Sequence, residues 1–204
     1  MESHAPAQTH AGHEVDVNRM ALSATLHCLT GCAIGEVAGV IIGTALGWSD
    51  AATIALAIGL AFLFGYALTS WPLLRAGLAF AAVVPIALAS DTLSIAVMEI
   101  VDNGILLIIP GAMEAGLDDV LFWGSLSFAL FIAGFVAYPV NRWSLRRGKG
   151  HMAVHNTGVH GGPDPRVVGA ILAVAFVFGT TVLVAEALDT DMPERHAGRT
   201  VPSG

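Results

Sequence analysis

Long apolar runs separated by short polar segments dominate the hydrophobic pattern of this chain. Five runs are long enough to cross a bilayer as helices, because about 20 apolar residues span roughly 30 Å of hydrocarbon. The runs cover residues 20–47, 51–70, 75–109, 120–140 and 167–186. They lack the period-two alternation of membrane-spanning strands. The pattern predicts an all-α, polytopic membrane helix bundle of about five transmembrane helices.

The third run, residues 75–109, is longer than one crossing requires. As a straight helix it would extend about 50 Å. We therefore expect it to tilt, kink or break, with Pro85 and Ser90-Asp91 as candidate break points. A broken run would give six membrane segments in place of five. Pro72 is expected to end the second run.

Composition and charge agree with a membrane location. Only 12% of the residues are charged and 55% are hydrophobic, whereas soluble domains carry roughly 25% charge. The net charge of −7, with no basic block before residue 142, argues against binding to nucleic acid. Two cysteines are too few for a secreted disulfide scaffold. The bilayer is thus the first expected partner.

The basic residues predict the orientation. Seven of the nine lie on one side of a five-span arrangement: Arg19, Arg75, Arg142, Arg146, Arg147, Lys149 and Arg166. This asymmetry predicts a cytoplasmic N-terminus and an external C-terminus. The expected organisation is a cytoplasmic tail at 1–19, a bundle at 20–187 with a cytoplasmic loop at 141–166, and an acidic external tail at 188–204.

The first span carries polar groups that lipid does not favour. Cys28, Cys32 and Glu36 follow a four-residue spacing, so they form a stripe along one helical face, and His27 lies at its edge. Glycines repeat every four residues beside the stripe, from Gly31 to Gly47. Small residues at this spacing allow close helix packing, either inside the chain or between copies in a homo-oligomer.

The third span carries a second set of polar residues, which could face the polar stripe of the first span. Asp91, Met98 and Asp102 lie close together on a helical wheel, with Glu99 beside them. Ionisable groups at membrane depth cost about 3 kcal/mol each on insertion scales and usually mark function. A single carboxyl group could serve helix association alone, and the cysteines could be packing residues. Four carboxyl groups on two spans favour a polar path.

Counting residues from the cytoplasmic ends predicts how the two spans align. Glu36 is 17 residues after Arg19, and Asp91 is 16 residues after Arg75. Both carboxyl groups should then lie about 25 Å along their helices. We therefore expect Glu36 and Asp91 to meet.

The residue types of this path suit cations. Thiolate and thioether ligands favour Cu(I), and Cys together with His also suits Zn(II). The expected metal-binding residues are His27, Cys28, Cys32, Glu36, Asp91, Met98, Glu99 and Asp102. A possible secondary metal site is formed by His151 and His155. A path of carboxylates alone would instead favour a hard cation or proton-coupled transport.

Several motifs resemble a domain-of-unknown-function family of bacterial multi-pass inner-membrane proteins. They are HCxxGCxxGE at 27–36, DTLSIxxMEIVDN at 91–103, PVNRW at 139–143 and RGKGH at 147–151. The resemblance covers about residues 20 to 155. It implies an inner-membrane location and no particular activity.

Three functions remain open from the sequence. The first is transport or binding of a soft metal, copper or zinc, through the Cys/His/Met/carboxylate path. The second is an intramembrane metal-dependent hydrolase, which would need a metal with an open coordination position. The third is a non-catalytic assembly or sensor protein that reads metal or pH through its histidines. An enzyme is the less favoured reading, and no catalytic residue is assigned.

Overall fold

The computed structural model describes residues 10–147 and 165–190. Within these ranges all the regular structure is helical, and each of the helices is long and apolar enough to cross a membrane. They are α1 (His10–Ala45), α2 (Asp50–Arg75), α3 (Phe80–Ile108), α4 (Val120–Arg146) and α6 (Pro165–Thr190). The predicted five-helix membrane bundle is thus confirmed. The bounds differ from expectation, because α1 already begins at His10 and α4 continues to Arg146.

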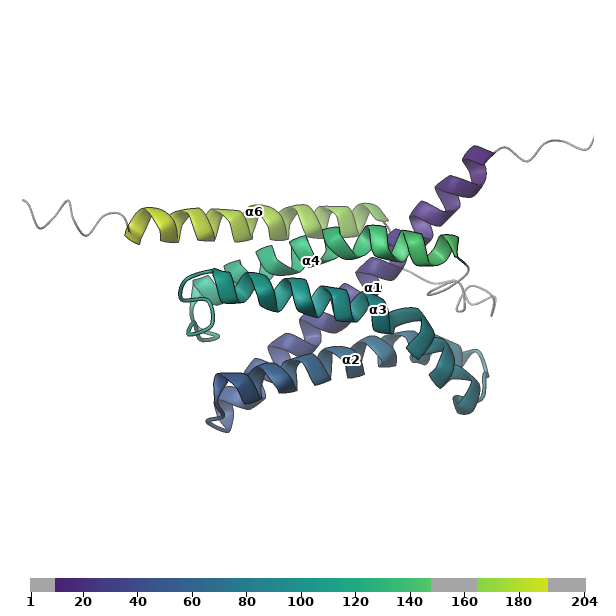
Figure 1. The fold of residues 1–204 in the computed structure, drawn as a ribbon. Helices are drawn as coiled ribbons and strands as arrows, with labels where there is room; N and C mark the ends of the chain where they lie inside the picture. Colours follow the sequence, from purple (N-terminus) through teal and green to yellow (C-terminus); the bar gives the residue numbers. More distant parts are fainter. Residues whose placement is uncertain (1–9, 148–164, 191–204) are drawn as a thin grey trace, which may run out of the picture.

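The helices alternate in direction along the bundle. α1, α3 and α6 run one way, while α2 and α4 return (Figure 1). As a result, the described ends of the chain, His10 and Thr190, lie at opposite ends of the molecule (Figure 1). α2 packs mainly against α1, and α6 packs mainly against α4. α1, α3 and α4 also contact one another, so the interior lies between these three helices.

Glycines on α1 fit against small residues of α2. A Cβ added to Gly31 would come within 2.6 Å of the Gly65 Cα, and one added to Gly39 would meet Ala57 at 2.5 Å. Gly35 meets the Ala61 backbone even more closely. Backbones at this separation gain van der Waals contact, which drives helix association in lipid. The glycine repeat of α1 is therefore occupied by packing within the chain.

The third apolar run is divided differently from the prediction. α2 continues through Pro72 to Arg75, and α3 begins only at Phe80. A turn separates them, in which Gly77 adopts a positive φ of 88° and Leu78 N–H donates to the Leu73 carbonyl at 3.2 Å. The predicted end of the second span at Pro72 is wrong. Pro72 lies in the last turn of α2, where it lacks one N–H donor, but its carbonyl still accepts from the Ala76 N–H at 3.0 Å, so the helical pattern continues past it.

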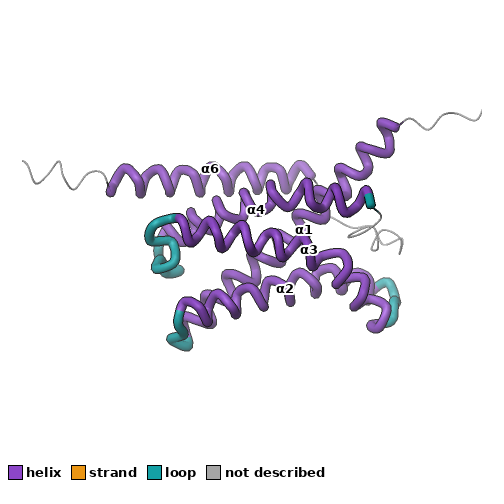
Figure 2. The backbone as a smooth tube through the Cα atoms, viewed as in Figure 1, coloured by secondary structure: helices purple, strands orange, loops and turns teal. Residues whose placement is uncertain are grey.

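Once its first residues are assigned to α2 and the turn, α3 needs no break. It is one continuous helix that includes Pro85, Ser90 and Asp91. Figure 2 shows that α3 is bent rather than straight. Proline inside a helix removes a hydrogen bond and commonly causes such bending. Within the described residues, the chain therefore has five membrane segments rather than six.

The two ends of the bundle differ in charge. Arg19, Arg75 and Arg146 lie toward one end, which we call the basic end. The opposite, acidic end carries the α1–α2 and α3–α4 connections, with Asp50 and Glu114. Tryptophans lie at both ends: Arg75 stacks over Trp71 at 4.7 Å and Arg147 over Trp143 at 4.1 Å, whereas Trp48 and Trp123 belong to the acidic end. Aromatic belts of this kind mark membrane interfaces.

Candidate functional site

Three facing pairs of acidic and thiol side chains connect α1 to α3. We call them the ladder: Cys28 with Asp91, Cys32 with Glu99, and Glu36 with Asp102. The Cys28 Sγ donates to Asp91 Oδ1 at 3.9 Å. The Cys32 thiol contacts the Glu99 carboxyl group, and the Glu36 carboxyl group contacts that of Asp102. The sequence-predicted groups on these two spans are thus brought together.

Helix periodicity explains why these side chains share one interface. The α1 members stand four residues apart, so they lie one above the other along one face. At 100° per residue, Asp91, Glu99 and Asp102 fall within an arc of about 80° on α3. α1 and α3 run in the same direction (Figure 1), so residue numbers rise together along both sides of the ladder.

All six ladder side chains are buried. Cys28 and Asp91 have no exposed surface, and Glu36 and Glu99 are each only 5% exposed. α1 beyond Arg19 and the whole of α3 contain no lysine or arginine. The carboxyl groups therefore lie in an apolar interior with no lysine or arginine on the helix segments that carry them. Burial of this kind is costly and is typically retained for function.

Asp102 faces a second acceptor rather than a donor. Neither of its carboxyl oxygens receives a hydrogen bond when both acids are ionised, and its neighbour is Glu36. The contact becomes a carboxyl–carboxylate hydrogen bond when one of the two groups carries a proton. The geometry of this pair is thus suited to holding and passing a proton.

Neighbouring polar side chains orient two of the acids. Ser90 Oγ donates to Asp91 Oδ1 at 2.8 Å, so this oxygen accepts from both Ser90 and Cys28. Asn103 Nδ2 donates to Glu99 Oε2 at 3.4 Å and to the Glu99 backbone carbonyl at 3.0 Å. Such bonds fix the rotamers of buried acids.

The alignment of the two spans differs from the expected one. Asp91 contacts Cys28, and Glu36 lies against Asp102, so the predicted meeting of Glu36 with Asp91 is wrong. The reason is the late start of α3. Counting depth from Arg75 placed Asp91 too far along its helix, because Arg75 belongs to α2.

Two other predicted ligands lie close by. Met98 is fully buried in one apolar cluster with Cys28 and Cys32. His27 is half-buried on α1 next to Cys28. The described residues contain no group of three or more His, Cys, Asp or Glu side chains that could hold a metal ion. His151 and His155 lie outside the described residues.

A buried amide junction, which sequence reasoning missed, continues the polar interior toward the basic end. Asn141 Nδ2 donates to Thr25 Oγ1 at 2.9 Å and to Ser94 Oγ at 3.0 Å. The three residues are buried and come from α1, α3 and α4. In the sequence, Asn141 stands beside Arg142 and resembles part of a basic topology anchor. The available signal was that Asn141 directly follows the fourth apolar run, so it can lie in the same helix.

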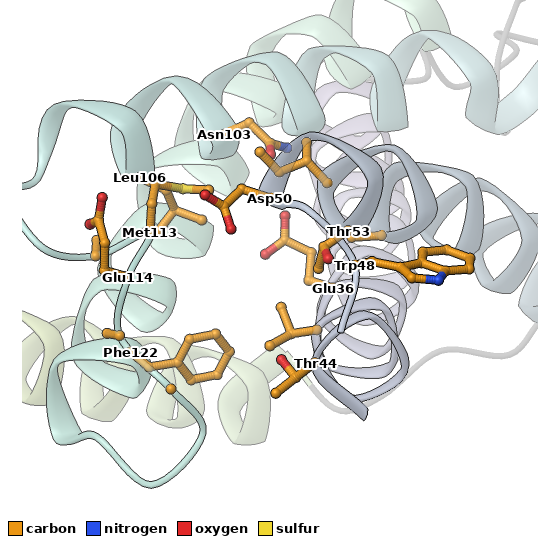
Figure 3. Close-up of a pocket in the computed structure, with 16 residues that line it drawn as sticks. Glu36, Thr44, Trp48, Asp50, Thr53, Asn103, Leu106, Met113, Glu114 and Phe122 are labelled. Atoms are coloured by element: carbon orange, nitrogen blue, oxygen red, sulfur yellow. The ribbon is translucent and has the colours of Figure 1, made fainter. Parts of the chain in front are cut away.

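A cavity of about 260 Å³ opens at the other end of the ladder. It lies between α1, α2 and the connection from α3 to α4. Figure 3 shows the Glu36 carboxylate pointing into this space, with Glu114 on the opposite wall. Its polar lining residues are Glu36, Thr44, Asp50, Thr53, Asn103 and Glu114. Glu36 thus lines the cavity and also forms the ladder pair nearest to it, the pair with Asp102.

Comparison with known proteins places this site within one family. No curated protein and no solved structure matches the chain. One family profile matches residues 17–150, a stretch that includes the ladder, the amide junction and the cavity and ends before α6. The chain therefore belongs to the family described as Domain of unknown function (DUF4396).

Proposed function

We propose that this membrane protein transports cations across the bilayer along the α1–α3 ladder, and that the proton is the cation that the ladder suits best. The carrying observation is that three buried acidic or thiol pairs follow one another inward from a cavity at the acidic end. Each pair joins two groups that can exchange a proton. No larger ligand cluster is required for that chemistry.

The spacing of the pairs indicates how a proton would travel. Successive α1 members of the ladder are four residues apart, which is about 6 Å of helix. A direct hydrogen bond spans about 3 Å, so transfer between pairs needs a bridging water or a side-chain rotation. Within each pair the groups are already in contact. Beyond Cys28, the hydroxyl group of Thr25 extends the polar groups toward the basic end, and Asn141 connects it to Ser94, which stands between Asp91 and Glu99 on α3.

The expected location is the bacterial inner membrane, with the basic end in the cytoplasm. The clustering of Arg19, Arg75 and Arg146 at one end supports this orientation through the positive-inside rule. The cavity would then face the outside. Uptake would begin at Glu36 and finish beside Asn141.

Soft-metal transport, with Cu(I) or Zn(II) as cargo, is the second candidate. It is favoured by the buried cluster that unites Met98 with Cys28 and Cys32. It predicts stoichiometric Cu(I) or Zn(II) binding that a Cys28→Ser/Cys32→Ser double variant loses. Unchanged binding in that variant would rule out the thiols as ligands. The hydrolase and the sensor alternatives stay predictions without a finding in their favour.

Proton flux into liposomes tests the main proposal. Purified protein is reconstituted with a pH-sensitive dye inside, and valinomycin with potassium holds the membrane potential at zero. We expect proton uptake to fall at least about tenfold in Glu36→Gln, Asp102→Asn and Glu99→Gln, which corresponds to about 1.4 kcal/mol of barrier or more. These amides keep the size of the side chain but cannot release a proton.

Glu186→Gln is the matched control, because Glu186 is an exposed carboxyl group on α6. It should leave proton uptake unchanged. Thermal melting of each variant separates loss of transport from loss of fold. Proton flux that survives in folded Glu36→Gln and Glu99→Gln proteins would overturn the proposal, and would favour the assembly or sensor reading.

A further inference from the structure

The two ends of the ladder differ in what a proton would meet. At the acidic end, Glu36 points into a cavity of about 260 Å³ (Figure 3). At the other end, the polar interior reaches the amide of Asn141. A relay needs groups that both take up and release a proton, and a side-chain amide does neither near neutral pH. The amide junction therefore needs an explanation of its own.

The Thr25 hydroxyl group fixes how the amide is turned. It has one proton, and it donates that proton to the Ala21 carbonyl at 2.9 Å. Toward Asn141 it can therefore only accept, so the Asn141 nitrogen, at 2.9 Å, is the donor. The opposite orientation of the amide would place two acceptors against each other. The nitrogen atom, rather than the oxygen atom, thus faces Thr25.

The same nitrogen also donates to α3. Its second proton goes to Ser94 Oγ at 3.0 Å. The Ser94 hydroxyl group contacts the Cys28 thiol, which in turn donates to Asp91 Oδ1 at 3.9 Å. Because Ser94 accepts from Asn141, its own proton is directed at Cys28. The donors from Asn141 to Asp91 thus all point toward the carboxyl group of the ladder.

This arrangement stops a proton at Asn141. To pass from Ser94 to Thr25, the proton would have to be accepted by the amide nitrogen and released on its other side. The electron pair of that nitrogen is delocalised into the carbonyl group, so the nitrogen acts only as a donor. Its N–H groups also carry partial positive charge, which opposes an arriving cation. The amide therefore interrupts the chain of exchangeable groups.

Apolar packing closes the same end of the path. A buried cluster joins α1 to α4, with Tyr138 packed against it, and its members are Val17, Met20, Ala21 and Leu145. Ala21 lies one turn before Thr25, and Leu145 lies one turn after Asn141. Because α1 begins and α4 ends at the basic end (Figure 1), both lie on the basic-end side of the junction. The described structure is thus open beside Glu36 and closed beside Asn141.

We infer that Asn141 is the proton barrier of this chain, the residue that separates the ladder from the basic end and limits the rate at which protons leave it. The inference rests on the proposed function, because a barrier matters only where protons move along the ladder. For each proton that passes, the amide has to turn away and a water molecule has to take its place. That water can accept a proton on the Ser94 side and release one on the Thr25 side.

Asn141→Asp tests the inference in the liposome assay described above. Aspartic acid has nearly the shape of asparagine, but it takes up and releases a proton. We expect proton uptake at least about tenfold faster than in the native chain, because an exchangeable group replaces a blocking one. Uptake at the native rate in a folded Asn141→Asp protein would overturn the inference. Asn141→Ser, which also supplies an exchangeable proton, carries the same expectation and replaces the aspartate variant if that protein does not fold.

Asn141→Leu is the matched control for loosened packing. Leucine is similar in size and loses both hydrogen bonds of the amide, but it carries no proton, so uptake should not rise. The double variant Asn141→Asp/Glu36→Gln should lose the gain, because protons still enter the ladder at Glu36. An equal rise in Asn141→Leu, or a rise that survives Glu36→Gln, would be a leak through a loosened bundle and would overturn the inference.

The same measurements separate this inference from the proposed function. Glu36-dependent uptake in Asn141→Asp but not in the native chain would refute transport by the native protein and leave the barrier standing. Glu36-dependent uptake at one rate in both proteins would refute the barrier alone. If neither protein carries protons, both the transport and the barrier are refuted.

Discussion

Asn141 joins three helices through a single side chain. Its amide donates to one hydroxyl on α1 and one on α3, at 2.9 and 3.0 Å, from a position on α4. Hydrogen bonds between membrane helices contribute about 0.6 kcal/mol on average and up to about 1.7 kcal/mol each. We predict that Asn141→Ala lowers the free energy of unfolding by about 1–3 kcal/mol, measured by detergent titration of the purified protein.

Ser125→Ala provides the comparison for this prediction. Ser125 is also buried on α4, but its hydroxyl donates to the carbonyl groups of Leu121 and Phe122 in its own helix. Removing it should change the stability by less than about 0.5 kcal/mol. If the two variants lose equal stability, Asn141 does not hold the helices together.

At the scale of helices, the α1–α2 contact depends on the absence of side chains. Gly35 lies directly against the Ala61 backbone, which cannot move as a flexible side chain could. Adding a methyl group forces the helices apart, and overpacking typically costs about 1–3 kcal/mol. We predict that Gly35→Ala lowers the melting temperature, although alanine is the better helix former by up to about 1 kcal/mol.

The glycine at position 59 separates packing from helix propensity. A Cβ added to Gly59 on α2 meets nothing within 4 Å. Gly59→Ala should therefore leave the melting temperature unchanged or raise it. A similar fall in both variants would show that close approach is not the cause.

At the scale of the whole molecule, the direction of the bundle in the membrane can be read from its two ends. Ser49 is exposed in the connection at the acidic end, and Ala76 is exposed in the turn at the basic end. We predict that Ser49→Cys reacts with an impermeant maleimide added to intact cells, and that Ala76→Cys reacts only after the membrane is opened. The opposite labelling pattern would reverse the proposed orientation and place the cavity in the cytoplasm.

The native chain is the control for this labelling. Cys28 and Cys32 are free thiols with at most 1% of their surface exposed, so the bulky reagent should not reach them in the folded protein. Strong labelling of the native chain would mean that a solvent-filled opening wide enough for the reagent leads to the ladder.

Much of this architecture follows from local pattern. The number of spans depends on the length of each hydrophobic run, which is a local property of the sequence. The helical period likewise places Cys28, Cys32 and Glu36 on one face without any information from other helices. Charged residues at membrane depth stand out in the sequence because hydrocarbon penalises them wherever they occur. The ladder residues could therefore be selected in advance, although their partners could not.

Relative position was decided by the tertiary structure. The pairing of Cys28 with Asp91 depends on the turn at Gly77 and on where α3 begins. One misassigned helix end shifts the expected membrane depth of every residue that follows in that helix. The role of Asn141 and the cavity beside Glu36 arise only where separate helices and connections converge. The sequence by itself determined which residues are costly in a membrane. Three-dimensional packing decided which of them meet, because side chains on different helices come into contact only through the assembled bundle.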